Sequence, residues 1–402
     1  MRRVRVSRRL SALATIVVVA SIVPASLALR SKPPADWRAA IRTLQPRAEA
    51  GRLVQPLSDG GRVELTLIPE LQRAAERLLA EADPIQGSAV MVSIHDGRVL
   101  ALAGRNRATA GTNDPSLATT AWAPAASVFK LVTTAALLDA GLHADTRVCY
   151  HGGVHSVEAD NLEDHPAADG RCKSLGYGLA KSQNAIIARL AHDYLDPAAL
   201  ERSATAFGFG TAPAFELPTA ASTLTLPADG LGFARTAAGF WNSKLSALHG
   251  AMVAATIARG GESVDPRLVE RVLDGNGRVM PLPAAAAPRR ALDADTAREL
   301  GLMMVGTTEW GSATRAFRDP STHRRRLAGV RVAGKTGTLT GKDPALAYSW
   351  FVGFAPADKP EVAFAVLLGR ADEADIRAAE VARALLATWL TTESISPLVA
   401  AR

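Results

Sequence analysis

Hydrophobic and polar positions change from a helical period to a strand period early in the chain. In residues 68–82, IPELQRAAERLLAEA, apolar side chains recur every three or four positions, which predicts an amphipathic helix. Residues 88–104, SAVMVSIHDGRVLALAG, form two apolar runs around Asp96 and Gly97, a dipeptide typical of hairpin turns. We therefore expect a helix followed by a β-hairpin.

A second group of strand patterns lies near the other end of the chain. Three short runs rich in β-branched and aromatic residues are separated by turn segments, at 330–339, 348–356 and 361–369. Residues 375–390, DIRAAEVARALLATWL, return to the helical period, and the chain between the two strand regions is mostly helical in pattern. The simplest arrangement is an α/β (α+β) domain whose sheet is assembled from both ends, with a helical subdomain inserted.

The N-terminus carries a long apolar segment. Residues 10–29, LSALATIVVVASIVPASLAL, contain no charge and are long enough to span about 30 Å of hydrocarbon as a helix. The basic segment 1–9 precedes them, so we expect a single-pass anchor in the cytoplasmic membrane with the remainder on the extracytoplasmic side. The alternative is a signal peptide cleaved near Ser26 to Ala28.

The rest of the chain divides into three parts. Residues 30–64 are mixed in character and predict a juxtamembrane linker with one or two helices followed by a turn. Residues 65–392 have the helical and strand patterns of a globular domain, and 393–402 are a short C-terminal tail. Only 34 residues, 31–64, separate the apolar segment from the globular domain, which argues against a second enzymatic domain before it.

The basic character of the chain comes almost entirely from its first 30 residues. The formal net charge is +7, and six arginines with no acidic residue lie in that stretch. The remainder is close to neutral, so the charge does not point to a nucleic-acid partner.

The two cysteines, Cys149 and Cys172, are expected to form a disulfide in an exported protein. Free thiols are one alternative. A metal cluster is another, because the segment between the cysteines also holds His151, His155, Asp160, Asp164 and His165. The spacing lacks the tight Cys or His pairs of a closed zinc site, and we expect no metal.

Candidate chemistry begins at AASVFKL, residues 125–131. Ser127 and Lys130 are three positions apart at the start of a predicted helix that continues to Gly141, so their side chains share one face. A desolvated lysine near the positive end of a helix can have its pKa lowered enough to take the proton of a serine hydroxyl. The competing interpretation is a helix-capping serine beside a lysine that extends to water.

Two further motifs favour the catalytic interpretation. Ser182 and Asn184 form an S-x-N triplet just before an apolar helical segment. Lys335, Thr336, Gly337 and Thr338 lie at the end of a predicted strand, and their first three residues read K-T-G. Each motif alone has an ordinary structural explanation, as a helix cap or a polar strand edge. The three together, in this order, are specific.

The combination of S-x-x-K, S-x-N and K-T-G resembles the signature of penicillin-recognising serine enzymes. Over residues 65–392 the chain is similar to a penicillin-binding protein transpeptidase domain, including LSALHGAMVAATIARGG at 245–261 and the strand at 348–356. This resemblance implies the penicillin-binding/β-lactamase-like fold, with an antiparallel sheet flanked by helices.

The resemblance also implies a role for each motif residue. Ser127 attacks the penultimate D-Ala carbonyl of a peptidoglycan stem peptide, Lys130 accepts its proton, and Ser182 passes a proton to the leaving amine. The implied substrate-binding residues are Asn184, Lys335, Thr336, Gly337 and Thr338. The backbone N–H groups of Ser127 and Thr338 form the oxyanion hole.

The expected function is that of a peptidoglycan D,D-transpeptidase inhibited by β-lactams, without a cofactor. The expected partners are stem peptides, β-lactam antibiotics, the membrane and other cell-wall synthesis proteins. One alternative is a D,D-carboxypeptidase or β-lactamase of the same fold, although FELPTAAS around Glu216 lacks the E-x-x-x-N that would position a deacylating water. Another is a membrane-anchored sensor or scaffold without turnover.

Overall fold

The structure is a computed structural model that describes residues 36–109, 111–153, 155–341, 344–372 and 377–395 of the 402-residue chain. The expected anchor at 10–29 lies outside these residues, as does most of the expected tail. Among the helices of the described ranges, none is long and apolar enough to cross a membrane.

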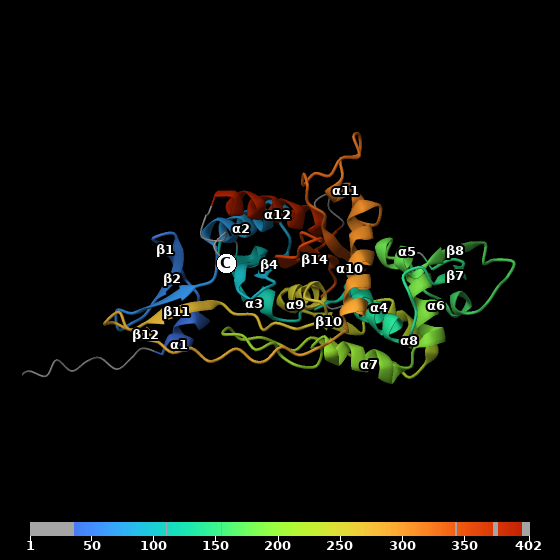
Figure 1. Ribbon diagram of the computed structural model, residues 1–402, viewed down its shortest axis with the longest axis horizontal. Coiled ribbons are helices and arrows are strands. Elements are labelled where there is room, and N and C mark those ends of the chain that lie inside the picture. The colour runs from blue at the N-terminus through green and yellow to red at the C-terminus, as the bar shows by residue number, and fades with distance from the viewer. Residues whose placement is uncertain (1–35, 110, 154, 342–343, 373–376, 396–402) are drawn as a thin grey trace, which may run out of the picture.

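The central feature is a five-stranded antiparallel sheet built from the two ends of the domain (Figure 1). Its strands, in spatial order, are β13 (Ala333–Thr340), β14 (Ala347–Ala355), β15 (Val362–Arg370), β4 (Gln86–Ser93) and β5 (Val99–Asn106). Strand β15 pairs with β4, which joins the C-terminal strands to the N-terminal hairpin. The predicted hairpin, the three later strands and the origin of the sheet are confirmed.

Both faces of the sheet are covered, which explains why its strands are apolar at almost every position. Along β15, Val362, Phe364 and Val366 pack into one core with helices α2 (Pro69–Ala82) and α12 (Ala378–Ile395). Ala363 and Ala365 point to the opposite core, where α9 (Ala247–Ala258) packs. The alternation follows from the two-residue period of a strand. The predicted helix at 68–82 is confirmed as α2. The one predicted at 375–390 is confirmed from Ala378 onward as α12, and residues 375–376 lie outside the described residues.

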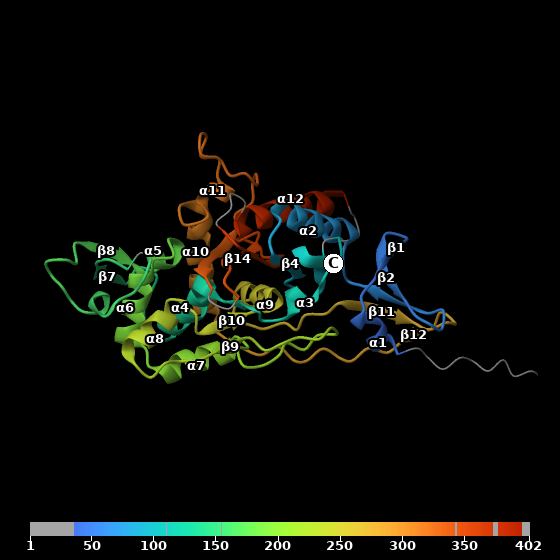
Figure 2. The same ribbon diagram turned by 180° about the vertical axis from the view of Figure 1, so that it is seen from behind.

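A helical lobe lies beside the β13 edge of the sheet, as both views show (Figure 1 and Figure 2). It contains α4 (Lys130–Asp139), α5 (Leu175–Ala180), α6 (Asn184–Tyr194), α7 (Pro197–Ala206), α8 (Gly230–Ala237) and α10 (Ala294–Glu309). Shorter segments connect the lobe to the sheet: η1 (Arg107–Thr109), α3 (Ser116–Thr119), β6 (Ala123–Pro124), η2 (Ala126–Phe129), β9 (Thr223–Leu224), β10 (Ser243–Leu245) and α11 (Thr314–Phe317). The helical insertion predicted between the two strand regions is therefore present.

A disulfide-linked ribbon projects from the helical lobe. Strands β7 (Arg147–Tyr150) and β8 (Arg171–Ser174) pair with Cys149 opposite Cys172, and these two cysteines form a disulfide. The chain between the strands contains one short turn, η3 (Ala159–Leu162).

The prediction of a helical linker over 30–64 is wrong for most of its described part. After α1 (Trp37–Arg42), the chain forms β1 (Arg47–Glu49), β2 (Arg52–Pro56) and β3 (Arg62–Leu65). These strands join β11 (Val269–Leu273) and β12 (Val279–Met280) in a second sheet, at the end of the molecule away from the helical lobe (Figure 1).

Long-range pairing explains this error. Glu64 of β3 is buried, and Arg271 of β11 donates hydrogen bonds to its carboxylate at 2.8 and 3.0 Å. The partner strand lies about two hundred residues downstream, so local periodicity does not reveal it. A domain boundary at residue 65 would cut through this sheet.

We predict that Trp389→Ala destabilises the domain through the core between α12 and the sheet. The Trp389 side chain is 2% exposed, and truncation of a buried Trp lowers the free energy of unfolding by about 3–5 kcal/mol. Leu302→Ala is the matched control because Leu302 is 60% exposed on α10, and such surface changes are usually within about 0.5 kcal/mol. Urea unfolding of both variants measures the effects. Equal stability of the two variants would contradict the described packing.

Candidate active site

Ser127 lies in η2, the short turn that leads into α4. Ala126, directly before it, has φ +50°, a left-handed conformation that is uncommon outside glycine. Gly239 packs against this turn. A Cβ atom at position 239 would lie 2.3 Å from the Ala126 carbonyl oxygen and 3.0 Å from the Ser127 Cα, and φ at Gly239 is +87°. The segment after α8 therefore supports the turn that carries Ser127.

Lys130 lies one helical turn after Ser127 and is fully buried. Its Nζ atom lies 2.7 Å from Ser127 Oγ, 2.7 Å from Asn184 Oδ1 and 2.6 Å from the Ala238 carbonyl oxygen. Burial disfavours the charged ammonium and lowers the pKa of Lys130 to about 7. A substantial fraction of this lysine is therefore neutral near neutral pH.

The three partners of Lys130 determine how its neutral amine is oriented. A neutral amine has two N–H donors and one lone pair. Asn184 Oδ1 and the Ala238 carbonyl oxygen can only accept, so they take both N–H groups. The lone pair is left for the Ser127 hydroxyl, which then donates its proton to Nζ. This is the arrangement that a general base requires.

The second and third motifs meet at another buried lysine. Lys335 Nζ donates to Ser182 Oγ at 2.8 Å and to the Thr336 carbonyl oxygen at 2.8 Å. Burial, and secondarily the positive charge of Lys130, lower the pKa of Lys335. Ser182 has φ +58°, so its side chain is presented from a left-handed turn just before α6. The fold thus brings together the three motifs predicted from the sequence.

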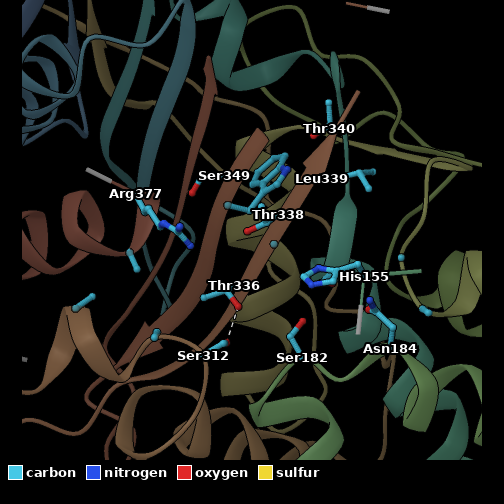
Figure 3. Close-up of a pocket in the computed structure, with 18 of the residues that line it drawn as sticks. His155, Ser182, Asn184, Ser312, Thr336, Thr338, Leu339, Thr340, Ser349 and Arg377 are labelled. Atoms are coloured by element: carbon cyan, nitrogen blue, oxygen red, sulfur yellow. Dashed lines mark hydrogen bonds between the residues drawn. The ribbon is translucent and has the colours of Figure 1, made fainter. Parts of the chain in front are cut away.

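Strand β13 forms the edge of the sheet, and its polar residues face a cleft. The cleft has a volume of about 550 Å³. Figure 3 shows Thr336, Thr338 and Thr340 in order along this strand, with Ser182, Asn184 and His155 on the opposite side. The residues that line the cleft include Ser127, His155, Ser182, Asn184, Ser312, Arg315, Thr336, Gly337, Thr338, Leu339, Thr340, Ser349 and Arg377.

Gly337 has a packing role in addition to the expected one at the substrate. A Cβ atom at this position would lie 3.0 Å from Trp350 Cβ and 3.3 Å from Val128 Cγ2. The absence of a side chain therefore lets β13 approach the turn of the nucleophile closely. The Trp350 indole N–H donates to the Pro124 carbonyl oxygen at 2.9 Å and fixes the same turn from its other end.

Several lining residues carry no signal in the sequence motifs. Ser312 Oγ lies 2.6 Å from Thr336 Oγ1, and this pair is drawn in Figure 3. Arg315 follows on α11, and Arg377 directly precedes α12. A serine or arginine at a helix end is common in any protein, so only the folded chain shows that these residues share the cleft.

The disulfide-linked ribbon contributes His155 to the cleft wall. A Cβ atom at Gly153 would lie 2.4 Å from Ala185 Cβ, and Val157 is fully buried. His155 therefore lies between two anchored positions.

The metal cluster considered from the sequence is not assembled. His151 lies between Asp169, at 2.7 Å, and Asp160, at 2.9 Å. His165 contacts the same Asp160, whereas His155 faces the cleft. In the part of the chain that the structure describes, no group of three or more His, Cys, Asp or Glu residues is arranged to hold a metal ion.

Two carboxylates bear on whether the cleft can activate water. Glu216 accepts the backbone N–H groups of Leu268 and Val269, at 2.9 and 3.2 Å, and thus caps a strand of the second sheet. Glu380, the one carboxylate among the described lining residues, lies on α12 and accepts the Arg377 N–H at 3.2 Å. Both are engaged in structural contacts.

This geometry defines a class of protein: serine acyl-transfer enzymes in which a buried lysine activates the nucleophile. The family model described as the penicillin binding protein transpeptidase domain matches residues 87–387. The chain therefore belongs to the penicillin-binding protein transpeptidase family.

Individual relatives agree with this assignment. The chain is 30% identical over 346 residues to the peptidoglycan D,D-transpeptidase PbpA of Mycolicibacterium smegmatis, covering 77% of this chain and 67% of the relative. The crystal structure of PBPA from Mycobacterium tuberculosis superposes with a TM-score of 0.69 at 28% identity, covering 82% of each chain. An imipenem acyl-enzyme complex of penicillin-binding protein A from M. tuberculosis superposes with a TM-score of 0.66 at 28% identity, covering 82% of this chain and 80% of the other.

We predict that acylation of Ser127 by a penicillin becomes faster as the pH rises through about 7, the pKa of Lys130, and then levels off. Below this pKa the amine is protonated and has no lone pair for the hydroxyl proton, so the rate falls by about tenfold per pH unit well below it. Penicillin labelling that is quenched at fixed times, repeated at each pH, measures the rate of acylation. A rate that does not change with pH would contradict the assignment of Lys130 as the base.

Proposed function

We propose that the protein is a peptidoglycan D,D-transpeptidase that cross-links stem peptides through an acyl-enzyme on Ser127. The observation that carries the proposal is the 2.7 Å contact between Ser127 Oγ and Nζ of the buried Lys130, with Ser127 lining a cleft along a sheet edge. Membership of the family and the D,D-transpeptidase names of the relatives support the same reaction.

In the proposed acylation step, Ser127 Oγ attacks the carbonyl carbon of the penultimate D-Ala. The hydroxyl proton passes to Lys130 Nζ as the new C–O bond forms. The backbone N–H groups of Ser127 and Thr338 are proposed to stabilise the oxyanion, an interaction whose loss typically costs about 3 kcal/mol. The C–N bond to the terminal D-Ala then breaks, and its amine leaves with that proton, which Lys130 Nζ gives up by way of Ser182 Oγ.

Substrate binding is proposed to use the exposed edge of β13. An extended peptide can add to such an edge through main-chain hydrogen bonds. Lys335 lies at the Thr336 end of this edge, so we assign the substrate's terminal carboxylate to this end. An approaching carboxylate favours the charged form of Lys335, which counteracts the lowering of its pKa by burial. Asn184 and the hydroxyls of Thr336 and Thr338 are proposed to bind the substrate amides and carboxylate.

The second half of the reaction is proposed to use an amine of another stem peptide. Hydrolysis by the β-lactamase route would require a carboxylate that holds and activates a water beside the ester. Glu216, the carboxylate considered for that role, is engaged with the second sheet. This contact favours aminolysis, and therefore a transpeptidase, over a β-lactamase.

The cellular location is also a proposal. We infer that residues 10–29 anchor the chain in the cytoplasmic membrane and that the catalytic domain lies on the extracytoplasmic side, where peptidoglycan and other cell-wall synthesis proteins are its partners. The uncharged 20-residue segment after a basic one supports the anchor. The disulfide between Cys149 and Cys172 supports an oxidising compartment.

We predict that the full-length protein converts a pentapeptide donor and a second stem peptide into a cross-linked dimer. Ser127→Ala removes the nucleophile and should abolish dimer formation. Ser321→Ala changes an exposed serine outside the cleft and is expected to retain it. Chromatography with mass detection separates the dimer from a tetrapeptide released by hydrolysis. Tetrapeptide as the sole product would show a carboxypeptidase, and no product from the unmodified protein would favour a sensor.

A further inference from the structure

The active-site cleft has two walls of different character. Figure 3 shows Ser182, Asn184 and His155 on one side of β13, where the helical lobe lies, and Ser349 and Arg377 on the other side. The residues assigned to catalysis lie on the first side or on the strand itself. We name the opposite side the arginine wall, and its members are Ser312, Arg315, Ser349, Arg377 and Glu380.

Arg377 reaches the cleft from the start of α12. Ala378, the first residue of this helix, donates its backbone N–H to Ser349 Oγ at 3.1 Å. Ser349 is directly opposite Thr338 in the ladder between β13 and β14, and neighbouring strands lie about 5 Å apart. The start of α12 therefore lies one strand away from Thr338, the residue proposed to hold the oxyanion, and Arg377 lines the cleft there.

Arg315 approaches the cleft from α11, which packs against α12. Ser312 Oγ lies 2.6 Å from Thr336 Oγ1, and Arg315 and Ala316, further along the same segment, also line the cleft. Thr336 and the neighbouring Lys335 amine are the proposed binding site of the terminal D-Ala. The segment that carries Arg315 therefore borders the position of the leaving group.

Positive charge prevails on the arginine wall. Among the described residues of the wall, Glu380 is the one carboxylate beside two guanidinium groups, and it accepts the backbone N–H of Arg377 at 3.2 Å. Two other arginines of this region, Arg318 and Arg325, instead form ion pairs with Glu309, which is outside the cleft lining. The wall thus presents a net positive charge to the cleft, which suits an anionic ligand.

The second half of the reaction determines which ligand meets this wall, so this step rests on the proposed function. Aminolysis is the reverse of acylation with a different amine. The acceptor nitrogen attacks the ester carbonyl carbon, the new C–N bond forms, and the C–O bond to Ser127 breaks. One proton of the amine passes by way of Ser182 Oγ and Lys130 Nζ to Ser127 Oγ. The acceptor amine therefore takes the place of the D-Ala amine, beside Thr336.

The rest of the acceptor must extend out of the cleft from this place. In the proposed orientation the acyl chain of the donor follows β13 toward Thr340, and the helical lobe closes the side of Ser182. The side that is left is the arginine wall. Stem peptides carry further carboxylates besides the one next to the reacting amine, and a guanidinium group pairs with a carboxylate through two parallel hydrogen bonds.

We propose that the arginine wall binds carboxylates of the acceptor stem peptide, with Arg315 and Arg377 as the acceptor-binding residues. The wall selects an acidic peptide for the second half of the reaction. It therefore favours cross-linking to a second stem peptide over transfer to an uncharged amine.

The test uses the full-length protein, one pentapeptide donor and two acceptor stem peptides that differ in charge. The first acceptor has all its carboxylates free, and in the second those not adjacent to the reacting amine are amides. The readout is the ratio of the two kcat/KM values for dimer formation, because a general loss of activity lowers both values alike. We expect the unmodified enzyme to prefer the acidic acceptor by about tenfold at low salt, as two partly exposed ion pairs would give. Added salt should reduce this preference.

Three variants of the wall give effects of opposite sign. Arg315→Gln and Arg377→Gln should each lower the ratio by about threefold, because each removes one positive charge. Glu380→Gln should raise the ratio, because it removes the negative charge of the wall, and a merely disturbed structure would not increase the preference. Arg202→Gln is the matched control. Arg202 is an exposed arginine on α7, outside the cleft lining, and this variant should keep the ratio of the unmodified enzyme.

Several outcomes would overturn the inference and leave the proposed transpeptidase in place. These are a ratio near one in the unmodified enzyme, an undiminished ratio in both arginine variants, a lowered ratio in Glu380→Gln, or an equal loss in Arg202→Gln. Slower acylation by penicillin in the arginine variants, with an unchanged ratio, would show that Arg315 and Arg377 bind the carboxylate of the donor and would also overturn it. Failure to form dimer with either acceptor would instead refute the proposed function, and this inference with it.

Discussion

The burial of the Lys130 amine is the constraint on which the rest of the site depends. A buried ammonium without sufficient partners is unfavourable, and a neutral amine requires acceptors for its two N–H groups. Those acceptors are supplied by Asn184, at the start of α6, and by the Ala238 carbonyl oxygen, just after α8. The contacts between α4, α6 and α8 therefore do more than fill the helical lobe. They leave the lone pair of Lys130 directed at Ser127.

The sheet provides the other half of the site. Because β13 is an edge strand, one side of it is free to face a ligand, and the turn of Ser127 packs against it at Gly337. The turn of Ser127 and strand β13 pack into the same core, to which Val128 and Ala333 both belong. The cleft lies where the sheet and the helical lobe meet.

The sequence predicted the features that depend on local patterns. The helix at 68–82, the hairpin around Gly97 and the later strands follow from periodicity, and the structure contains them. The three motifs predicted the residues around the cleft because each motif spans only a few consecutive residues of the sequence. Long-range features could not be predicted in this way. The second sheet requires β3 to pair with a strand about two hundred residues away, and the Ala238 carbonyl belongs to a residue with no distinguishing side chain.

The most direct test of the central claim is intact mass spectrometry of the full-length protein mixed with a penicillin and followed over hours. Ser127 activated by Lys130 should give a one-to-one adduct that persists and maps to Ser127, because Glu216 is engaged with the second sheet and Glu380 with the Arg377 N–H. An adduct on another residue would contradict the assignment of the nucleophile. Steady consumption of the drug with only a transient adduct would show that the site hydrolyses its acyl-enzyme, and would contradict the proposed transpeptidase.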